Sequence, residues 1–174
     1  MSAEDFAFAQ AHVRILSGLY GLLRPLDAIE PYRLEMGSSL KNPRGKNLYA
    51  WWGDTLAVAV NKALASHDDQ SVVNLASAEY FSAVAVGALK GTIVTPSFKE
   101  EKDGKLRSLQ FFAKRARGAM ARWAIDNRAT RAGDLKDFSV GGYTFRPNQS
   151  DERDWLFARP QPPLKGQQRD IGAP

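Results

Sequence analysis

The spacing of hydrophobic and polar residues changes period along this chain, and each period predicts a different element of secondary structure. Near the N-terminus, apolar residues recur every three or four positions from Phe6 to Tyr20. Ser2 followed by Asp5 has the form of a capping box, so we expect a first helix over residues 3–17. The helical period returns at residues 53–65 and predicts a second helix there.

Between these helices, residues 18–48 break the pattern. The dipeptides Arg24-Pro25 and Glu30-Pro31 push the residue before each proline away from helical geometry. We therefore expect turns and short pieces in this segment, packed by the apolar side chains scattered along it.

The middle of the chain alternates between strand-like and helix-like segments. Residues 71–76 (SVVNLA) form a short, β-branched apolar run that is typical of a buried strand. We expect a helix over residues 77–86 and a further strand at residues 92–94, opened by Gly91. This alternation predicts an α/β fold, a mixed sheet with flanking helices.

Asp103-Gly104 predicts a β-hairpin, because this dipeptide suits the two positive-φ positions of a type I′ turn. In that register Glu100 faces Arg107, and Phe98 faces Leu109 on the same side of the ribbon. We expect Glu100 and Arg107 to form a charge pair.

The remaining elements follow the hairpin. A helix is expected over residues 112–127, and two strands at residues 143–146 and 154–158. Residues 1–159 are expected to form a single domain, and the Pro- and Gln-rich residues 160–174 a disordered tail.

Composition excludes several kinds of chemistry. With no cysteine in the chain, disulfides, thiolate metal sites and cysteine nucleophiles are excluded. His12 and His67 are the only histidines, and a packed or exposed role is expected for both. There is neither a dinucleotide fingerprint nor a GxxxxGK[ST] phosphate loop, so we predict no nucleotide cofactor. Two histidines are too few for a histidine-rich metal site, which leaves a site made of oxygen ligands alone as the alternative to the expected absence of a metal. The acidic start and the lack of a membrane-length apolar run indicate a cytoplasmic protein without a membrane partner.

Positive charge is concentrated in one stretch. Residues 105–131 hold eight basic residues against one acid, Asp126, and so carry a net charge of +7, whereas the whole protein totals +5. A concentrated positive field suggests a polyanionic partner, with DNA or another nucleic acid as the default candidate.

The predicted helix at residues 112–128 separates this charge from an apolar stripe. The stripe that should face the core is Phe112, Ala116, Ala119, Met120 and Trp123. The basic side chains form two rows on the opposite side: Lys114, Arg117 and Arg128 in one, Arg115 and Arg122 in the other.

Gly118 lies between the two basic rows. A glycine inside a helix costs about 1 kcal/mol relative to alanine, so the space it leaves should be needed. Either a phosphate backbone approaches there between the arginines, or another segment of the protein packs there. Ile125 lies near Gly118 on the same side and favours the second interpretation for its patch.

Two further groups are candidates for a cleft. Glu79 and Tyr80 follow the predicted strand, where open α/β sheets build sites, although helix capping by Ser77 and core packing of Tyr80 would also explain them. Arg24 and Arg33, with Glu35, form either an ion-pair network or part of a cleft.

Trp51-Trp52 either stacks on bases or buries at least one ring in the core. A second, smaller basic loop follows the proline-punctuated segment and contains Lys41, Arg44 and Lys46.

Four strings carry a family resemblance. They are residues 14–37 (RILSGLYGLLRPLDAIEPYRLEMG), 52–54 (WGD), 74–81 (NLASAEYF) and 113–122 (AKRARGAMAR). The chain closely resembles the YaaA family of bacterial peroxide stress-resistance proteins, from about residue 4 to residue 159.

The resemblance implies a cytosolic role in the response to hydrogen peroxide, associated with limiting free intracellular iron. It also implies DNA binding by an unusual α/β protein, through a positively charged cleft and a helix-hairpin-helix element. Lys114, Arg115, Arg117 and Arg122 match the family's basic string and should line that cleft. The family's aromatic-acid pair falls on Glu79 and Tyr80.

The chain departs from the family at its start. Members begin with a short apolar strand followed by Ser-Pro-Ala-Lys, and this chain begins after that segment, so we interpret it as a fragment, a misassigned start or a shortened paralogue. We place the helix-hairpin-helix upstream of Met1, although residues 16–21 (LSGLYG) have some of its character. An unpaired sheet edge and exposed apolar surface are then expected, with reduced stability or self-association.

Two functional hypotheses follow. The first is a stress protein that binds nucleic acid through backbone phosphates and needs no catalysis; its principal contacts are Lys114, Arg115, Arg117, Arg122 and Arg128. The alternative is an enzyme acting on a phosphorylated or nucleotide substrate, with the arginines as an anion clamp and Glu79 or Tyr80 in proton transfer.

Overall fold

A mixed five-stranded sheet organises the computed structural model, which describes residues 1–163. The strands are β3 (Ser71–Val73), β4 (Thr92–Lys102), β5 (Lys105–Arg107), β6 (Thr144–Phe145) and β7 (Asp154–Pro160). Their order is β3-β4-β7-β6, with β5 paired to β4. The pairs β3-β4 and β4-β7 are parallel, whereas β5 and β6 are antiparallel to their neighbours. The predicted α/β fold with a mixed sheet is confirmed.

Five helices and a small second sheet surround these strands. The helices are α1 (Ala3–His12), α2 (Leu48–Trp52), α3 (Thr55–Leu64), α4 (Ala78–Phe81) and α5 (Gln110–Asp126). The second sheet is a hairpin of β1 (Ile15–Ser17) and β2 (Gly21–Leu23). Short 3₁₀ turns lie at Val86–Ala88, Ala132–Asp137, Val140–Gly142 and Pro147–Gln149.

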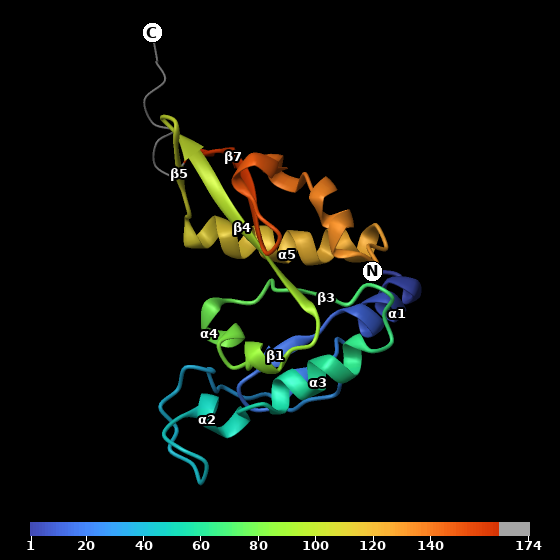
Figure 1. Ribbon diagram of the computed structural model, residues 1–174, viewed down its shortest axis with the longest axis vertical. Helices are drawn as coiled ribbons and strands as arrows, with labels where there is room; N and C mark the ends of the chain where they lie inside the picture. The colour runs from blue at the N-terminus through green and yellow to red at the C-terminus, as the bar shows by residue number, and fades with distance from the viewer. Residues whose placement is uncertain (164–174) are drawn as a thin grey trace.

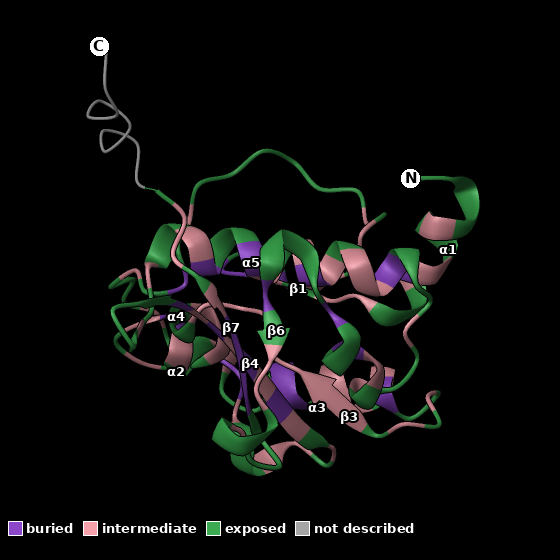
Figure 2. Cartoon of the chain, turned by 90° about the horizontal axis from the view of Figure 1, so that it is seen from above, coloured by how far each residue is buried: buried purple, intermediate pink, exposed green. Residues whose placement is uncertain are grey.

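The apolar side chains gather in two cores, one in each half of the view in Figure 1. The first lies between α5 and the strands β4 and β7, around Phe98, Met120 and Phe157. The second packs α2 and α3 against the N-terminal segments, around Met36 and Leu56. Figure 2 shows the buried residues concentrated along β4, β7 and the inner side of α5. The long strand β4 therefore links the two halves.

The predicted hairpin is present, but its charge pair is not. Asp103 and Gly104 have φ angles of 53° and 71°, and Glu100 faces Arg107 in the ladder. The Glu100 side chain points inward instead and is fully buried beside Tyr143 and Arg159. The expected charge pair with Arg107 is wrong because Tyr143 and Arg159 hold the Glu100 carboxylate in the core, whereas Arg107 is exposed at the end of β5.

The expected Phe98–Leu109 pair is also wrong. Strand β5 ends at Arg107, and Leu109 already precedes the first turn of α5. Phe98 packs on Phe157 instead, with 5.5 Å between ring centroids. Phe98 therefore packs in the first core, and the hairpin ends before it reaches Leu109.

Several predicted boundaries need correction. The first helix ends at His12, since Val13 is extended and residues 15–23 form the β1-β2 hairpin, not a helix-hairpin-helix turn. The helix expected over residues 77–86 ends at Phe81. Strand β4 continues well beyond residue 94, because it pairs with β7 along residues 95–101. Most of the predicted tail, residues 164–174, lies outside the described residues.

Candidate nucleic-acid interface

Helix α5 presents its basic side chains on the side away from the first core. Ala116 and Met120 are buried against the sheet, and Phe112, Ala119 and Trp123 are half-buried, so the predicted apolar stripe is confirmed. Lys114 and Arg115 are exposed, and Arg117 is half-buried. The helix therefore holds a basic surface in place by packing its opposite face.

The five predicted contact residues divide into two groups by their partners. In the N-terminal half of α5, Lys114, Arg115 and Arg117 form no ion pair with any residue in 1–163. The positive charge available to a ligand is thus greatest near the start of the helix.

Arg122, in the C-terminal half of α5, and Arg128, just after the helix, are already paired. Arg122 Nε lies 2.8 Å from the Asp126 carboxylate, and this hydrogen bond raises the pKa of Arg122. Arg128 NH2 lies 2.8 Å from Asp5 in α1, and its guanidinium sits over the Phe8 ring. A phosphate would have to compete with a carboxylate at both positions.

The surroundings of Gly118 and Ile125 decide between the two interpretations of this helix face. A Cβ built at Gly118 would meet no atom of another segment of residues 1–163 within 4 Å, so no described segment packs at Gly118 itself. Ile125 is buried at 8% exposure near α1, so its patch is packed as expected. The helix is open at its middle and covered at its end.

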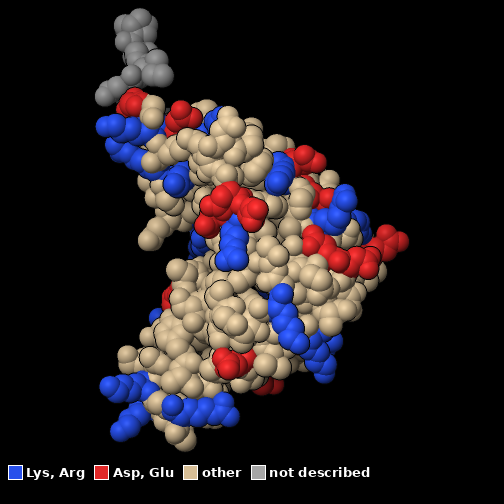
Figure 3. All heavy atoms as spheres, in the orientation of Figure 1, with Lys and Arg blue, Asp and Glu red and all other residues tan. Residues whose placement is uncertain are grey.

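A hollow of about 240 Å³ lies beside the first turns of α5. Arg117 and Ser108 line it on the helix side, Ser97 on β4, and Asn74 on the loop after β3. Figure 3 shows the molecule hollowed at the left, between the half that carries α5 and β5 and the half that carries α4 and α2. Arg117 therefore borders a recess rather than a flat surface.

Basic side chains also lie on either side of this recess. Exposed Lys102, Lys105 and Arg107 occupy the β4-β5 hairpin, immediately before α5. The smaller basic loop predicted at residues 41–46 lies next to α2, and its Lys41, Arg44 and Lys46 are exposed. Figure 3 shows lysine and arginine side chains at both corners of the hollowed side.

An exposed aromatic residue on α5 is part of this surface. Phe111 is 67% exposed, and the Arg115 guanidinium lies 5.7 Å from its ring centroid. Sequence reasoning placed Phe112 in the stripe and overlooked Phe111. The signal was there, because adjacent helical residues lie about 100° apart and cannot both face the core.

Trp51 and Trp52 also differ in burial, as Phe111 and Phe112 do. Trp52 packs on the second core and donates its indole N–H to Gly18 O at 3.2 Å. Trp51 is 38% exposed, with the Arg44 guanidinium 4.8 Å from its ring centroid. One ring is buried, as expected, and the other remains available to a ligand.

Glu79 and Tyr80 hold the loop at residues 35–37. Glu79 Oε1 accepts a hydrogen bond from the Gly37 N–H, and the Tyr80 hydroxyl donates to Glu35 Oε2, both at 2.8 Å. Burial, together with the bond to Glu35, raises the pKa of Tyr80 to about 12. Ser77 caps α4 and Tyr80 packs on the second core, so the structural explanation of this pair is confirmed.

Arg24 and Arg33 do not form the expected ion-pair network with Glu35. Arg24 NH2 lies 2.8 Å from Asp27 instead, and Arg33 is exposed without an ion pair within residues 1–163. The proline-containing turn brings Asp27 closer to Arg24 than Glu35.

In residues 1–163, no cluster of three or more histidine or carboxylate side chains is placed to hold a metal ion. The rings of His12 and His67 lie next to each other, with 4.6 Å between their centroids and an angle of 53° between their planes. No helix in the described part of the chain has the length and apolar content needed to cross a membrane.

Comparison with known proteins gives consistent matches. The family described as peroxide stress protein YaaA matches residues 1–149. UPF0246 proteins of Maricaulis maris and Phenylobacterium zucineum are each 57% identical to this chain, over 166 and 163 residues. A UPF0246 protein of Dinoroseobacter shibae is 51% identical over 173 residues. These matches cover 95%, 94% and 99% of this chain but 63%, 61% and 65% of the relatives, so it spans less than two thirds of their length.

Proposed function

The chain belongs to the YaaA family of peroxide stress proteins, and from this premise we propose that it acts in the cytoplasm during peroxide stress by binding DNA or another nucleic acid. The contact is with backbone phosphates, through the basic surface of α5 and the β4-β5 hairpin. The observation that carries the proposal is that Lys114, Arg115 and Arg117 have no carboxylate partner in residues 1–163. Of these three side chains, Arg117 also lines the recess beside α5.

The chemistry of these side chains suits phosphate. Arginine presents a planar fork of donors that matches phosphate oxygens, and lysine adds a mobile point charge. Since each contact releases counterions from the nucleic acid, affinity should fall steeply with salt. The open helix face at Gly118 lets a backbone approach these side chains closely.

Salt-dependent binding of duplex DNA tests the proposal. Contacts by all five of Lys114, Arg115, Arg117, Arg122 and Arg128 would give a log-log slope of about −4 to −5. Because Arg122 and Arg128 already bind carboxylates, we expect the three unpaired side chains to dominate, with a slope of about −3. A slope near zero, or no duplex binding in low salt, would rule the proposal out.

Two variants compare an unpaired arginine with a paired one on the same helix. Arg117→Ala should weaken binding to all sequences alike and lower the slope by about one. Arg122→Ala is the matched control, and it should change the slope much less because its guanidinium is engaged by Asp126. If the two substitutions changed the salt slope equally, Arg117 would not be a preferred phosphate contact over the paired Arg122.

The iron-limiting role implied by the resemblance is part of this proposal. We expect expression of the chain, in cells that lack their own family member, to lower chelatable iron after hydrogen peroxide treatment. Arg117→Ala would show whether that effect depends on nucleic-acid binding. No change in chelatable iron with the unsubstituted chain would remove iron limitation from the proposal.

The enzymatic alternative has less structural support. An anion clamp and a proton-transfer group should share one site, but Arg117 and Tyr80 line different hollows, and Glu79 and Tyr80 are held by residues 35–37. The test is Glu79→Gln. If this variant lost activity on a panel of metabolites and kept its DNA affinity, the result would favour the enzymatic alternative.

A further inference from the structure

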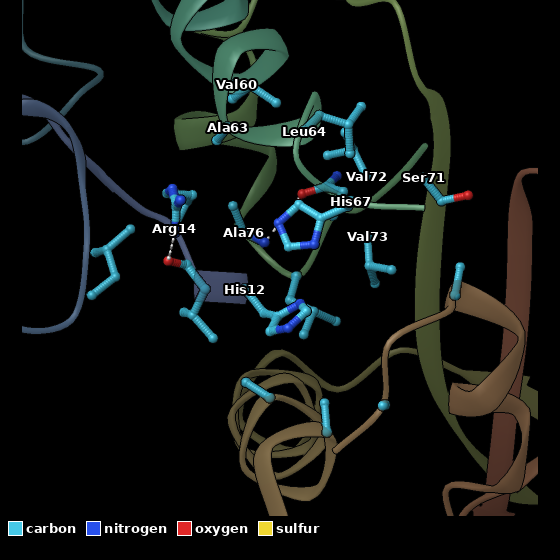
Figure 4. Close-up of a pocket in the computed structure, with 18 of the residues that line it drawn as sticks. His12, Arg14, Val60, Ala63, Leu64, His67, Ser71, Val72, Val73 and Ala76 are labelled. Atoms are coloured by element: carbon cyan, nitrogen blue, oxygen red, sulfur yellow. Dashed lines mark hydrogen bonds between the residues drawn. The ribbon is translucent and has the colours of Figure 1, made fainter. Parts of the chain in front are cut away.

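A large apolar cavity lies beside β3. Its volume is about 600 Å³, and its wall is formed by α1, α3, β3, α4, α5 and the segments that join them. Figure 4 shows Val60, Ala63 and Leu64 of α3 at this space, with the ring of His67 between them and His12. Most of this wall is hydrocarbon, so polar recognition of a ligand would depend on its few charged side chains.

The charged side chains at the cavity already have partners within residues 1–163. Arg14 donates to two backbone carbonyls, at 3.0 and 2.8 Å. Asp69 accepts a hydrogen bond from the Ala132 N–H at 2.7 Å, and Arg131 NH2 lies 3.3 Å from Asp134. The cavity therefore offers a polar ligand no free charge among the described residues, and we place no binding site there.

The loop before α2 has the opposite character. Residues 36–53 contain three basic residues, Lys41, Arg44 and Lys46, and no aspartate or glutamate. All three are exposed, and none of them forms an ion pair within residues 1–163. Figure 3 shows lysine and arginine side chains gathered at the lower corner of the molecule, where Figure 1 places this loop. With Trp51, these three residues form what we call the Trp51 site.

The other large side chains of α2 anchor the helix, and this leaves Trp51 on its outer side. Leu48 is buried, and Tyr49 and Trp52 pack on the second core. Adjacent helical residues lie about 100° apart around the axis, so Trp51 cannot share the buried direction of Trp52. The Trp51 ring is therefore 38% exposed on a helix that is fixed by its neighbours.

Arg44 is held against Trp51 by contacts within the chain. Its NH1 donates to Trp51 O at 2.9 Å, and its guanidinium lies 4.8 Å from the ring centroid. The loop backbone is fixed as well, since Asn42 and Gly45 exchange N–H···O bonds of 2.9 and 3.1 Å. A Cβ built at Gly45 would lie 2.5 Å from the Ala50 Cβ, so the loop runs directly against α2. The guanidinium and the indole thus form one pre-organised platform, which lowers the entropic cost of binding.

A flat ring with an adjoining negative charge suits this platform. Bases stack on aromatic rings and on guanidinium planes, and Lys41 and Lys46 supply charges for phosphates. In a duplex the faces of each base are covered by its neighbours, so an unpaired nucleotide is the form that can stack here. Three cations are fewer than the roughly four to eight that are typical of surfaces that bind anionic lipids. The chemistry therefore favours single-stranded nucleic acid over a membrane surface.

We propose that the Trp51 site binds single-stranded nucleic acid. One base stacks on the Arg44–Trp51 pair, and Lys41 and Lys46 bind the adjoining phosphates. The site lies on a different element from the basic surface of α5, and it recognises the face of an unpaired base in addition to the backbone. It does not depend on duplex binding by α5.

Tryptophan fluorescence of the full 174-residue chain tests the proposal. A short oligodeoxythymidylate would be titrated at low salt into the unsubstituted chain and into Trp51→Phe. We expect saturable quenching in the unsubstituted chain, because a stacked base lies against an exposed indole. Most of the quenching should be lost in Trp51→Phe, since Trp52, Trp123 and Trp155 are half-buried or buried.

Anisotropy of a labelled oligonucleotide measures the contribution of the ring to affinity. Trp51→Ala should weaken binding about five- to 150-fold, whereas Trp51→Phe keeps a ring and should retain most of the affinity. Phe6→Ala is the matched control, since Phe6 is 39% exposed on α1 and no cation of residues 1–163 lies over its ring. The variants are compared in a Phe111→Ala background, so that stacking on α5 does not contribute.

The lysines should set the salt dependence of single-strand binding. Lys46→Ala should lower its log-log slope by about 0.7, the contribution of one phosphate contact. Lys62→Ala, at an exposed position on α3, should leave the slope unchanged. Trp51→Ala should keep the duplex affinity, and Arg117→Ala should keep the quenching of Trp51. Failure of the Trp51 site and failure of the proposed function are therefore distinguishable.

Three outcomes would overturn the proposal. The first is no quenching by the oligonucleotide at low salt in a chain whose circular dichroism shows it to be folded. The second is equal weakening of single-strand binding by Trp51→Ala and Phe6→Ala. The third is quenching of Trp51 by phosphatidylserine vesicles but not by the oligonucleotide, which would assign the site to an anionic membrane surface.

Discussion

Glu100 is a residue of β4 whose carboxylate has no exposed surface, and its register partner on β7 is Arg159. The Tyr143 hydroxyl donates to its Oε1, and Arg159 Nε lies 3.5 Å from the same oxygen. The Arg159 guanidinium is itself held between the rings of Phe112 and Tyr143. Burial, with the hydrogen bond to Glu100, raises the pKa of Tyr143. This group joins the sheet to the start of α5 and so fixes the base of the basic surface.

Removing the Glu100 carboxylate should be strongly destabilising. Glu100→Ala leaves Arg159 charged and largely buried without its counter-ion, which we expect to cost about 3–5 kcal/mol of unfolding free energy in urea titrations. Glu101→Ala is the matched control, because Glu101 is exposed and pairs with Arg146 at 3.5 Å. Its cost should be below about 1 kcal/mol. Similar costs would show that the buried pair contributes no more than a surface one.

Phe111 should contribute to binding without contributing to folding. Since its ring is 67% exposed, Phe111→Ala should change stability by less than about 0.5 kcal/mol. Loss of a stacking surface beside Arg115 should weaken single-stranded DNA binding by about 1–3 kcal/mol. Val58, which is 61% exposed on α3, serves as a control in Val58→Ala. Unchanged affinity of Phe111→Ala would exclude base stacking on this ring.

At the scale of elements, α1 is attached to the C-terminal end of α5. The capping box predicted from Ser2 and Asp5 is formed, with Ser2 Oγ accepting from the Asp5 N–H at 3.1 Å. The Asp5 carboxylate also binds Arg128, whose guanidinium covers Phe8. The Asp5 carboxylate thus caps α1 and also attaches α1 to the end of α5 through Arg128. Because Arg128 is bound to Asp5, it is less available to a ligand on the basic surface.

The contribution of Asp5 should depend on pH. The Ser2 backbone N–H and Arg128 lower the pKa of Asp5 below its ordinary value of 3.8, so the folded protein favours the carboxylate. This stability is present above pH 3.8 and is lost as the pH falls through the lowered pKa. Asp5→Asn should therefore melt at a lower temperature than the unsubstituted chain at pH 7, and the difference should vanish in strong acid.

The control for this experiment lies on the same helix. Glu4 is exposed and forms no ion pair within residues 1–163, so Glu4→Gln should show no comparable pH-dependent difference. Asp5→Asn should also release Arg128 and steepen the salt dependence of DNA binding. Identical melting curves for both variants across the pH range would contradict the role given to Asp5.

At the scale of the whole molecule, β4 runs through both halves (Figure 1). The residues that line the apolar cavity come from both halves. Apolar side chains that line the cavity and stay in contact with water do not contribute hydrophobic stabilisation to the folded chain. We expect the isolated chain to show low thermal stability or to self-associate, measured by calorimetry and light scattering at several concentrations. A sharp, reversible transition of a monomer at high temperature would argue against this.

Filling the cavity should stabilise the molecule. Ala63 faces the space from α3, so Ala63→Leu adds apolar volume to the wall and should raise stability by about 0.5–2 kcal/mol. Val58→Leu, on the exposed side of the same helix, should have little effect. Calorimetry of the two variants compares them directly, and a lower melting temperature for Ala63→Leu would mean that the wall has no room.

The sequence by itself determined the local features of this protein. Asp103-Gly104 makes the hairpin turn because few residue pairs accept two positive φ angles, and Ser2 with Asp5 begins α1 because both bonds lie within four residues. The α5 stripe also follows from spacing alone, since one face of a helix must be buried.

Only the tertiary structure decided which side chains are free to act. It buried Glu100 and left Arg107 exposed, paired Arg128 with Asp5 across more than a hundred residues, and exposed Phe111 beside the unpaired arginines. It also placed a strand of interior composition, β3, at an edge. The physical reason is that turns and caps depend on neighbouring residues, whereas charge pairing and burial depend on contacts between distant segments that spacing does not encode.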